Sequence, residues 1–291
     1  MKTYQHQLPH CLARLTIQAI FCMVFVLLTL PSRTDASDVN TDPTLWIVDD
    51  VTNTVYEVLV VSGVPTVQSS LPIPSSADSE IAIAHDSSND TLWGVNESFG
   101  EFYNFSKTEE NKVFQVISLC DVRGENFPNR GDCKRGPEGI AVDFLNDTLW
   151  AVDDPPPSEE PLPPDDGPKV YNFTKDGTLI NSFTTSTFDP NSVSPQGIAT
   201  DPFDGTLWIT DNTSDLLYHV TANGQLLASF STRTLEPQAT NPQGISVDTR
   251  NGGLWQNSPS FVTQNYKFAS LTFSPISSYS RSAIKFFVAI A

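Results

Sequence analysis

The sequence predicts an all-β fold assembled from repeated units of four short strands. One observation is a Thr-Leu-Trp triplet that recurs at intervals of 47 to 58 residues and, with one Gly-Leu-Trp copy, contains every tryptophan of the chain. The copies end at Trp46, Trp93, Trp150, Trp208 and Trp255. A second observation is that turns rich in Asp, Gly, Asn and Pro separate short apolar runs without sustained helical periodicity. Together these features predict a β-propeller of five or six four-stranded blades, preceded by a signal peptide.

The N-terminal segment has the features of that signal peptide. Lys2 and Arg14 give a positively charged segment ahead of an apolar run from Leu15 to Leu30. Small residues around Ala36 fit a cleavage site. The run is shorter than the ~20 apolar residues of a membrane-spanning helix, although an uncleaved anchor is the alternative. We expect a signal peptide at residues 1–36, a propeller domain at residues 37–291, and a secreted protein, extracellular or periplasmic.

The composition is strongly acidic, with a formal net charge of −18. Nucleic acids and anionic membranes both attract clustered Lys and Arg, so neither is an expected partner. We expect no membrane span after signal cleavage, and a monomer whose ligand is an unknown protein or small molecule.

Two cysteines remain after the predicted cleavage, Cys120 and Cys133. An isolated pair in an oxidising compartment predicts a disulfide. A metal site is the alternative, but no further Cys or His lies nearby in the sequence to complete one.

The unit around Trp208 illustrates the expected strands of a blade. They span Gly197–Thr200, Thr206–Thr210, Leu216–Val220 and Leu226–Phe230. Because side chains alternate along a strand, Leu207 and Ile209 should pack on one neighbouring blade and Trp208 on the other. The tryptophans are therefore expected to be packing residues between blades.

An aspartate stands seven residues before four of the tryptophans, at Asp86, Asp143, Asp201 and Asp248. Each directly precedes a turn, where a carboxylate can accept hydrogen bonds from turn N–H groups. We expect a structural role for them. At the C-terminus, residues 276–291 include a strand-like run that could complete the first blade and close the ring, or belong to a weak sixth blade.

The repeat unit resembles NHL-type, gluconolactonase/regucalcin-like and streptogramin-lyase-like propellers. The resemblance covers roughly residues 44 to 258 and is carried by Pro195-Gln196-Gly197-Ile198-Ala199-Thr200-Asp201 and by Gly205-Thr206-Leu207-Trp208-Ile209-Thr210-Asp211. It implies the propeller fold. Function does not follow from it, because such folds host binding proteins and enzymes alike.

Chain geometry brings the start of each first strand and the end of each second strand to one end of the ring. Candidate ligand-binding residues at that end follow the tryptophans by three positions: Asp49, Asn96, Asp153 and Asp211. Two insertions, 120–136 and 154–168, fall at the same end, the first carrying basic residues and the second rich in proline and acid. Binding loops concentrate on one face of a scaffold, which makes this end the candidate functional face.

A metal site is the sharpest hypothesis for that end. In regucalcin- and gluconolactonase-like propellers, acidic and amide residues that open the innermost strands bind a divalent cation. The matching positions are Glu138, Gln196 and Gln243, and the expected cation is Ca²⁺. The sequence departs from the family pattern at both glutamines, so capping of strands is the alternative.

Catalysis by histidine has little support in the sequence. His85 and His219 are the histidines outside the signal segment, and neither occupies a repeated site position. Both are expected to be structural. Six N-glycosylation sequons begin at Asn89, Asn96, Asn104, Asn146, Asn172 and Asn212, several of them by-products of the repeated threonine.

Three functions remain open. The first is a binding or interaction module that engages its partner on the face bearing Glu138, Asp153 and Asp211. The second is a metal-dependent hydrolase or lactonase that uses the same channel. The third is an extracellular surface or matrix protein without a small-molecule site, which a channel blocked by apolar side chains would favour.

Overall fold

The computed structural model describes residues 44–49, 52–61, 64–74, 82–124, 136–154, 167–235, 240–250, 252–258, 261–269, 272–279 and 286–290. The chain separates into the units Met1–Thr41 and Asp42–Ala291, and every described residue belongs to the second. The predicted signal peptide, Cys133 and most of the proline-rich insertion lie outside the described residues. No helix within the described ranges is long and apolar enough to cross a lipid bilayer.

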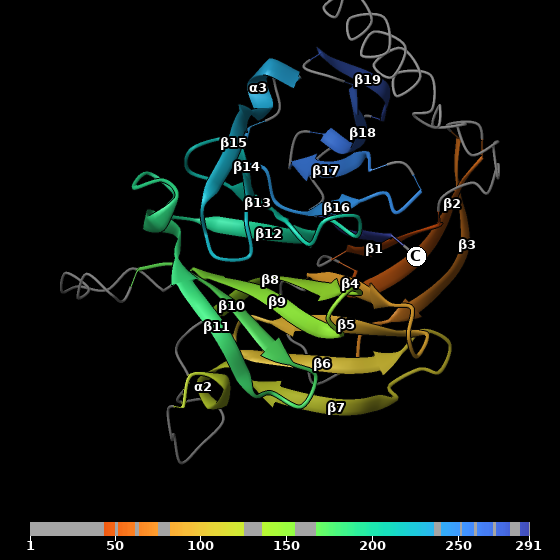
Figure 1. Cartoon of the computed structure of the whole chain (residues 1–291). Coiled ribbons are helices and arrows are strands. Elements are labelled where there is room, and N and C mark those ends of the chain that lie inside the picture. Colours follow the sequence, from red (N-terminus) through yellow and green to blue (C-terminus); the bar gives the residue numbers. More distant parts are fainter. Residues whose placement is uncertain are drawn as a thin grey trace, which may run out of the picture. The chain divides into compact units, whose positions relative to one another are not determined.

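In the described part of the chain, antiparallel strands form five four-stranded sheets, each a blade, around a common axis (Figure 1). The first sheet contains β1 (Thr44–Asp49), β2 (Thr54–Val61), β3 (Val64–Pro72) and β20 (Phe286–Ile290). The second contains β4 (Ile83–Asp86), β5 (Thr91–Asn96), β6 (Glu101–Ser106) and β7 (Val113–Ser118). The third contains β8 (Gly136–Asp143), β9 (Thr148–Asp154), β10 (Lys169–Thr174) and β11 (Leu179–Thr184).

The remaining two sheets follow the same order. The fourth contains β12 (Pro195–Thr200), β13 (Leu207–Asp211), β14 (Leu216–Val220) and β15 (Leu226–Ser231). The fifth contains β16 (Ile245–Val247), β17 (Leu254–Ser258), β18 (Phe261–Ala269) and β19 (Thr272–Tyr279). Among the described connections, three contain a single turn of helix: α2 (Leu119–Val122), η2 (Thr185–Thr187) and α3 (Thr232–Leu235).

The innermost strands of the five sheets contact one another in a closed cycle. Strand β4 touches β8, β8 touches β12, β12 touches β16, β16 touches β20, and β20 touches β4. Strand β20 pairs antiparallel with β1, so the last described residues of the chain share a sheet with the first. Residues 276–279 lie instead in β19.

The predicted packing of the Thr-Leu-Trp strand is confirmed. Leu207 and Ile209 lie in a core cluster with Trp150 of the preceding blade. Trp208 points the other way, into a cluster with Leu254 of the following blade. Tryptophan therefore fills the space between blades.

The threonine of the triplet bonds across to the third strand of its blade. Asn104 Nδ2 donates to Thr91 Oγ1 at 2.7 Å, and Asn172 Nδ2 donates to Thr148 Oγ1 at 3.0 Å. In the fourth blade, His219 Nε2 lies 2.7 Å from the Thr206 hydroxyl. The triplet thus combines a cross-strand hydrogen bond with packing on both faces.

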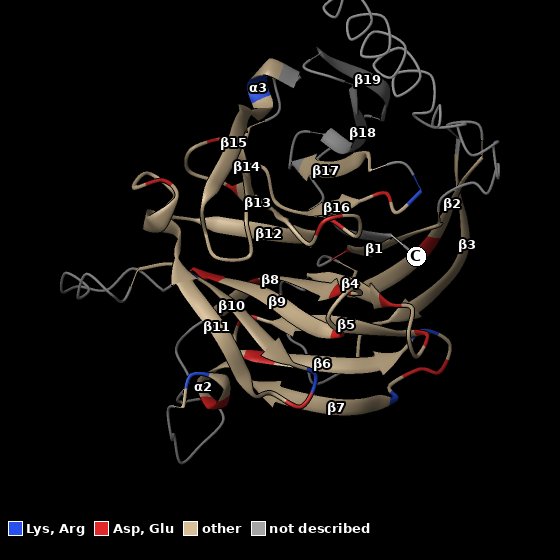
Figure 2. Cartoon of the chain, in the orientation of Figure 1, with Lys and Arg blue, Asp and Glu red and all other residues tan. Residues whose placement is uncertain are grey.

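The turn role of the repeated aspartates is also confirmed. Oδ1 of Asp86 accepts from the backbone N–H of Ser88, and Asp201 accepts in the same way from Phe203. Charged residues gather in such turns and at strand ends, and the middles of the strands are largely free of them (Figure 2).

Candidate functional site

The register of the sheets brings the predicted site positions to one end of the propeller, named the loop face. Pro137 is paired with Asp153, and Pro195 with Asp211, so inner strands begin where second strands end. The opposite end, named the turn face, carries the turns that follow Asp86, Asp143, Asp201 and Asp248. The predicted separation of the two sets of aspartates therefore holds.

Asp153 on the loop face is fully buried and bonded within the chain. Its Oδ1 accepts from the backbone N–H of Lys169 at 2.8 Å, and its Oδ2 accepts from the Tyr171 hydroxyl at 3.1 Å. Arg123 Nη1 lies 3.6 Å from the same Oδ2. The side chain of Asp153 thus joins the end of β9 to the start of β10.

Asp211 has a matching role in the next blade. Its Oδ1 accepts from the backbone N–H groups of Thr213 and Ser214, and its Oδ2 accepts from the Ser192 hydroxyl and the Ser194 N–H. Asp211 therefore closes the loop that follows its strand and holds the chain segment that enters the blade.

Asn96 and Asp49 complete the set of candidate ligand-binding residues. Oδ1 of Asn96 accepts from the backbone N–H of Phe99, and Oδ1 of Asp49 accepts from that of Thr52. Both side chains are buried. All four candidates are thus buried side chains that accept hydrogen bonds from the backbone of the loops above them. The exposed residues of these loops include Phe99 (38% exposed) and, in the segment bonded to Asp211, Val193 (49% exposed).

The insertion that starts at Cys120 is anchored to this face. Cys120 is buried within α2, and its predicted disulfide partner Cys133 lies outside the described residues, so the disulfide stays a prediction. Arg123, one of the basic residues of this insertion, has a side chain that is only 11% exposed. Its Nη1 donates to the Tyr171 hydroxyl at 2.8 Å, because the carboxylate of Asp153 behind that hydroxyl draws the cation in.

The predicted metal positions Glu138, Gln196 and Gln243 open three successive inner strands and are all buried. Nε2 of Gln196 donates to the Ser194 hydroxyl, and Oε1 of Gln243 has no hydrogen-bond partner. Ca²⁺ takes about six to eight oxygen ligands. Three side chains leave such a shell incomplete, and the described residues contain no group of three or more Asp, Glu, His or Cys able to hold a metal.

The inner strands of the blades surround a narrow central channel. Gly139 and Gly197, the third residues of Pro137-Glu138-Gly139 and Pro195-Gln196-Gly197, explain why it is narrow. A Cβ at Gly139 would lie 2.6 Å from the carbonyl oxygen of Gln196, and one at Gly197 would lie 2.2 Å from that of Gln243. The inner strands therefore approach so closely that only glycine fits. Thr210 joins them, since its hydroxyl accepts from the Gly197 N–H and donates to the Gln243 carbonyl.

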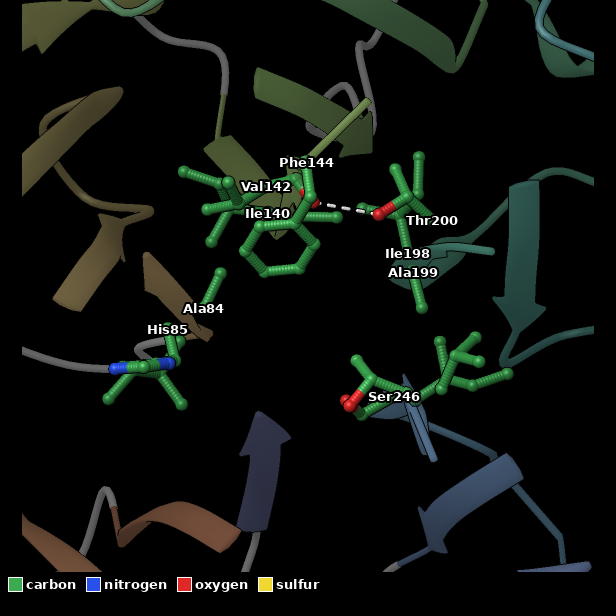
Figure 3. Close-up of a pocket in the computed structure, with 14 residues that line it drawn as sticks. Ala84, His85, Ile140, Val142, Phe144, Ile198, Ala199, Thr200 and Ser246 are labelled. Carbon is green, nitrogen blue, oxygen red and sulfur yellow. Dashed lines mark hydrogen bonds between the residues drawn. The ribbon is translucent and has the colours of Figure 1, made fainter. Parts of the chain in front are cut away.

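Apolar side chains line the channel itself. Equivalent isoleucines from four blades surround it: Ile83, Ile140, Ile198 and Ile245. The free volume is about 10 Å³ in the middle of the channel and about 40 Å³ toward the turn face. These volumes hold only a few water molecules. Figure 3 shows Phe144 and His85 among the side chains that line the wider part, and both residues stand at the turn-face end of their strands.

The two histidines differ in their surroundings. His219 stacks on Trp208 with ring centroids 4.1 Å apart, which suits the predicted structural role. His85 is buried at the channel mouth, its Nε2 lies 3.4 Å from Asp90 Oδ1, and its Nδ1 has no hydrogen-bond partner. Burial lowers the pKa of His85, and the charge of Lys107 adds to this, despite the nearby carboxylates.

Asp154 is the residue of the loop face that sequence reasoning missed. Burial, with the charges of Asp153 and Asp211, raises the pKa of Asp154 to about 6, although a hydrogen bond from Ser194 opposes the rise. The Ser194 hydroxyl donates to Oδ2 of Asp154 at 2.8 Å and thereby joins the third and fourth blades. The sequence signal for this raised pKa was the Asp-Asp doublet at 153–154. Two adjacent carboxylates repel each other, and one of them then holds its proton more tightly.

Neither a protein-family model nor a curated protein sequence matches the chain. Solved structures do. A chain of the nidogen/laminin complex gives a TM-score of 0.50 at 17% identity over 86% of this chain and 98% of that one. Virginiamycin B lyase from Staphylococcus aureus gives a TM-score of 0.45 at 16% identity, over 81% of this chain and 66% of that one. A streptogramin B lyase gives a TM-score of 0.44 at 20% identity, over 82% of this chain and 69% of that one.

This chain therefore spans about two thirds of the length of the virginiamycin B lyase chain. At such identities the likeness concerns the fold alone. Membership of the NHL-type or gluconolactonase-like groups stays a prediction. The sheets and the structural neighbours together make this chain a β-propeller with four-stranded blades.

Proposed function

We propose that the chain is an exported, five-bladed β-propeller that acts as a binding or interaction module. Residues 1–36 serve as its signal peptide, and its partner engages the loop face that bears Glu138, Asp153 and Asp211. The observation that carries this proposal is the apolar, nearly filled channel. Pockets for small molecules typically have volumes of ~300–1,000 Å³, so a contact surface on the loops suits the molecule better than a ligand inside the ring.

The buried acids of the loop face serve this function indirectly. The carboxylate oxygens of Asp153 and Asp211 accept hydrogen bonds from the N–H groups of their own loops. These bonds stiffen the loop backbone and so limit the conformational entropy that the loops lose when a partner binds. The partner then contacts the exposed tips, where Phe99 and Val193 offer apolar anchors. The acidic net charge favours a partner surface that is neutral or basic.

A photocrosslinking amino acid at position 193 tests this proposal, with the same group at position 223, in the turn between β14 and β15 at the opposite end of the ring, as control. Val193 and Asn223 are both exposed loop residues. In a preparation of extracellular proteins from the source cells, we expect a discrete adduct from position 193 alone. An adduct from position 223 alone, from both positions equally, or from neither, contradicts the assignment of the face.

The metal-dependent hydrolase or lactonase is a second candidate, favoured by one observation. Oε1 of Gln243 is buried without a hydrogen-bond partner at the start of an inner strand, as a ligand oxygen would be. The donor set around it is too small for Ca²⁺ by itself. Metal analysis decides: bound stoichiometric Ca²⁺ that is lost on Glu138→Ala and Asp153→Ala supports this candidate, and a melting temperature unchanged by chelator rejects it.

A further inference from the structure

The six sequons of the chain divide into accessible and inaccessible asparagines. Asn89 and Asn146 are exposed in the turns between the first and second strands of their blades. Asn96, Asn104 and Asn172 are buried within strands. Asn212 is half-buried beside Asp211 and belongs to neither group.

The buried asparagines are committed to the fold. Nδ2 of Asn104 donates to the Thr91 hydroxyl and lies 3.5 Å from the carbonyl oxygen of Leu92. Nδ2 of Asn172 donates to the Thr148 hydroxyl and to the carbonyl of Leu149 at 3.2 Å. A sugar on either Nδ2 would replace an amide proton that is donated in one of these hydrogen bonds. It would also need space inside a sheet that is packed between two neighbouring blades.

The exposed asparagines occupy equivalent turns. Asn89 and Asn146 both stand three residues after the repeated aspartate, and both precede an aspartate in the left-handed conformation, Asp90 (φ 61°) and Asp147 (φ 56°). Each asparagine also bonds within its own hairpin: Oδ1 of Asn89 accepts from the Thr91 hydroxyl at 2.5 Å, which leaves its Nδ2 available for a sugar. Nδ2 of Asn146 donates to Oδ2 of Asp143, and a substituted amide keeps one N–H for that bond.

We propose that Asn89 and Asn146 carry N-linked glycans and that the three buried sequons, at Asn96, Asn104 and Asn172, stay empty in the folded protein. The transfer forms a bond between Asn Nδ2 and C1 of the first sugar, and it breaks the bond from C1 to the diphosphate of a lipid-linked oligosaccharide. The lipid diphosphate leaves, and Nδ2 loses one proton. This proposal rests on the export proposed above.

A glycan at Asn146 also explains an exposed apolar patch on the turn face. Leu145 is 56% exposed and Phe203 is 60% exposed, and Phe144 at the channel mouth is 40% exposed. Leu145 reaches within 3.5 Å of the Cβ position of Gly205, so the two turns that carry the patch adjoin. Contiguous apolar surface of this kind promotes association unless it is covered, and a glycan in the same turn covers it. The turn of Asn89 has serines where the patch has Phe144 and Leu145, which makes it a matched control.

The test is site mapping on the full chain secreted from eukaryotic cells. An amidase that removes N-glycans in ¹⁸O-water marks each sugar-bearing asparagine as labelled aspartate, which peptide mass spectrometry locates. We expect label at Asn89 and Asn146 and none at Asn96, Asn104 or Asn172. Label at Asn104 or Asn172 in folded protein, or an unlabelled Asn146, overturns the proposal.

Two variants separate the covering role from mere occupancy. Asn146→Gln and Asn89→Gln should each migrate faster on electrophoresis by the step of one lost glycan, but only Asn146→Gln should bind more of a hydrophobic dye and associate. Equal dye binding by both variants contradicts the covering role. A second expression, with a host signal sequence fused ahead of the full chain, isolates the export proposal: if only this form is secreted and it is labelled as expected, residues 1–36 fail as a signal and the glycan sites stand.

Discussion

The indole Nε1 of Trp93 donates a hydrogen bond of 3.3 Å to Oδ2 of Asp86, across the first hairpin of the second blade. Trp150 and Asp143 repeat the bond at the same distance in the third blade. In both pairs, Oδ1 of the same carboxylate accepts from the turn between them. In these two blades one buried carboxylate therefore fixes the turn and orients the indole that packs against the next blade. The bond is not common to all the blades, because Nε1 of Trp255 has no hydrogen-bond partner although Asp248 stands seven residues before it.

Asp143→Ala should strongly destabilise the protein. The substitution removes acceptors from two turn N–H groups, the side-chain amide of Asn146 and the indole of Trp150. A buried donor left unsatisfied costs about 1–3 kcal/mol, so we expect the free energy of unfolding to fall by about 3 kcal/mol in urea titrations. Asp204→Ala is the control, because Asp204 is exposed and bonds only Thr206. A comparable loss in both variants would contradict the role of the buried carboxylate.

Lys175→Met should break a contact between blades. Lys175 Nζ lies 2.7 Å from Oδ2 of Asp86, which is fully buried, and 2.5 Å from Oδ1 of Asp147. Removing one partner of a buried pair leaves an uncompensated charge, so we expect a loss of about 3 kcal/mol at pH 7. Lys112→Met, which breaks an exposed pair with Glu109, should change stability by less than about 1 kcal/mol.

The same pair gives a pH dependence. Burial raises the pKa of Asp86, but hydrogen bonds from Lys175 and Ser88 outweigh it, and the net pKa lies below the usual 3.8. Its contribution to stability is therefore present above pH 3.8 and is lost as the pH falls through the lowered value. The difference between wild type and Lys175→Met should shrink at pH 2 to 3. A gap that stays constant down to that pH would show that lost packing, rather than lost charge, destabilises the variant.

Repetition made much of the fold predictable from the sequence. Five copies of one triplet placed the second strand of every blade, and the alternation of Leu207 and Trp208 then fixed which side faces which neighbour. The four strands predicted for the unit around Trp208 match β12 to β15 to within about two residues at each end, since turn residues mark those ends. The aspartate at each turn followed from the same periodicity.

The candidate site was less predictable, because its decisive contacts join distant parts of the chain. Arg123, from the insertion that precedes the third blade, meets Asp153 at the end of β9, and Ser194 meets Asp154 from the next blade. Asp153 and Asp211 stand where a ligand-binding carboxylate or a loop-closing carboxylate would equally stand. Only burial distinguishes the two, and burial depends on how the blades pack.

Asp154→Asn should stabilise the protein near neutral pH. Burial raises the pKa of Asp154 to about 6 from the usual 3.8. A carboxyl with a raised pKa contributes stability when it is protonated, so this contribution is full below pH 3.8 and is lost as the pH rises through about 6. Urea midpoints of the wild type should therefore include a decline from pH 4 to pH 7 that is absent in Asp154→Asn. The exposed substitution Asp204→Asn should keep the wild-type slope, and an unchanged slope in Asp154→Asn would refute the assignment.

Gly197→Ala tests the close approach of the inner strands. The added Cβ would lie 2.2 Å from the carbonyl oxygen of Gln243 and 2.9 Å from Oγ1 of Thr210, both held by the hydrogen bond between them. Backbone must shift to admit it, and overpacking of this kind costs about 1–3 kcal/mol. Gly167→Ala is the matched control, since a Cβ there meets nothing within 4 Å and should change stability by no more than about 0.5 kcal/mol. Differential scanning calorimetry of both variants measures the contrast, and equal melting temperatures would mean that the inner strands can separate without loss.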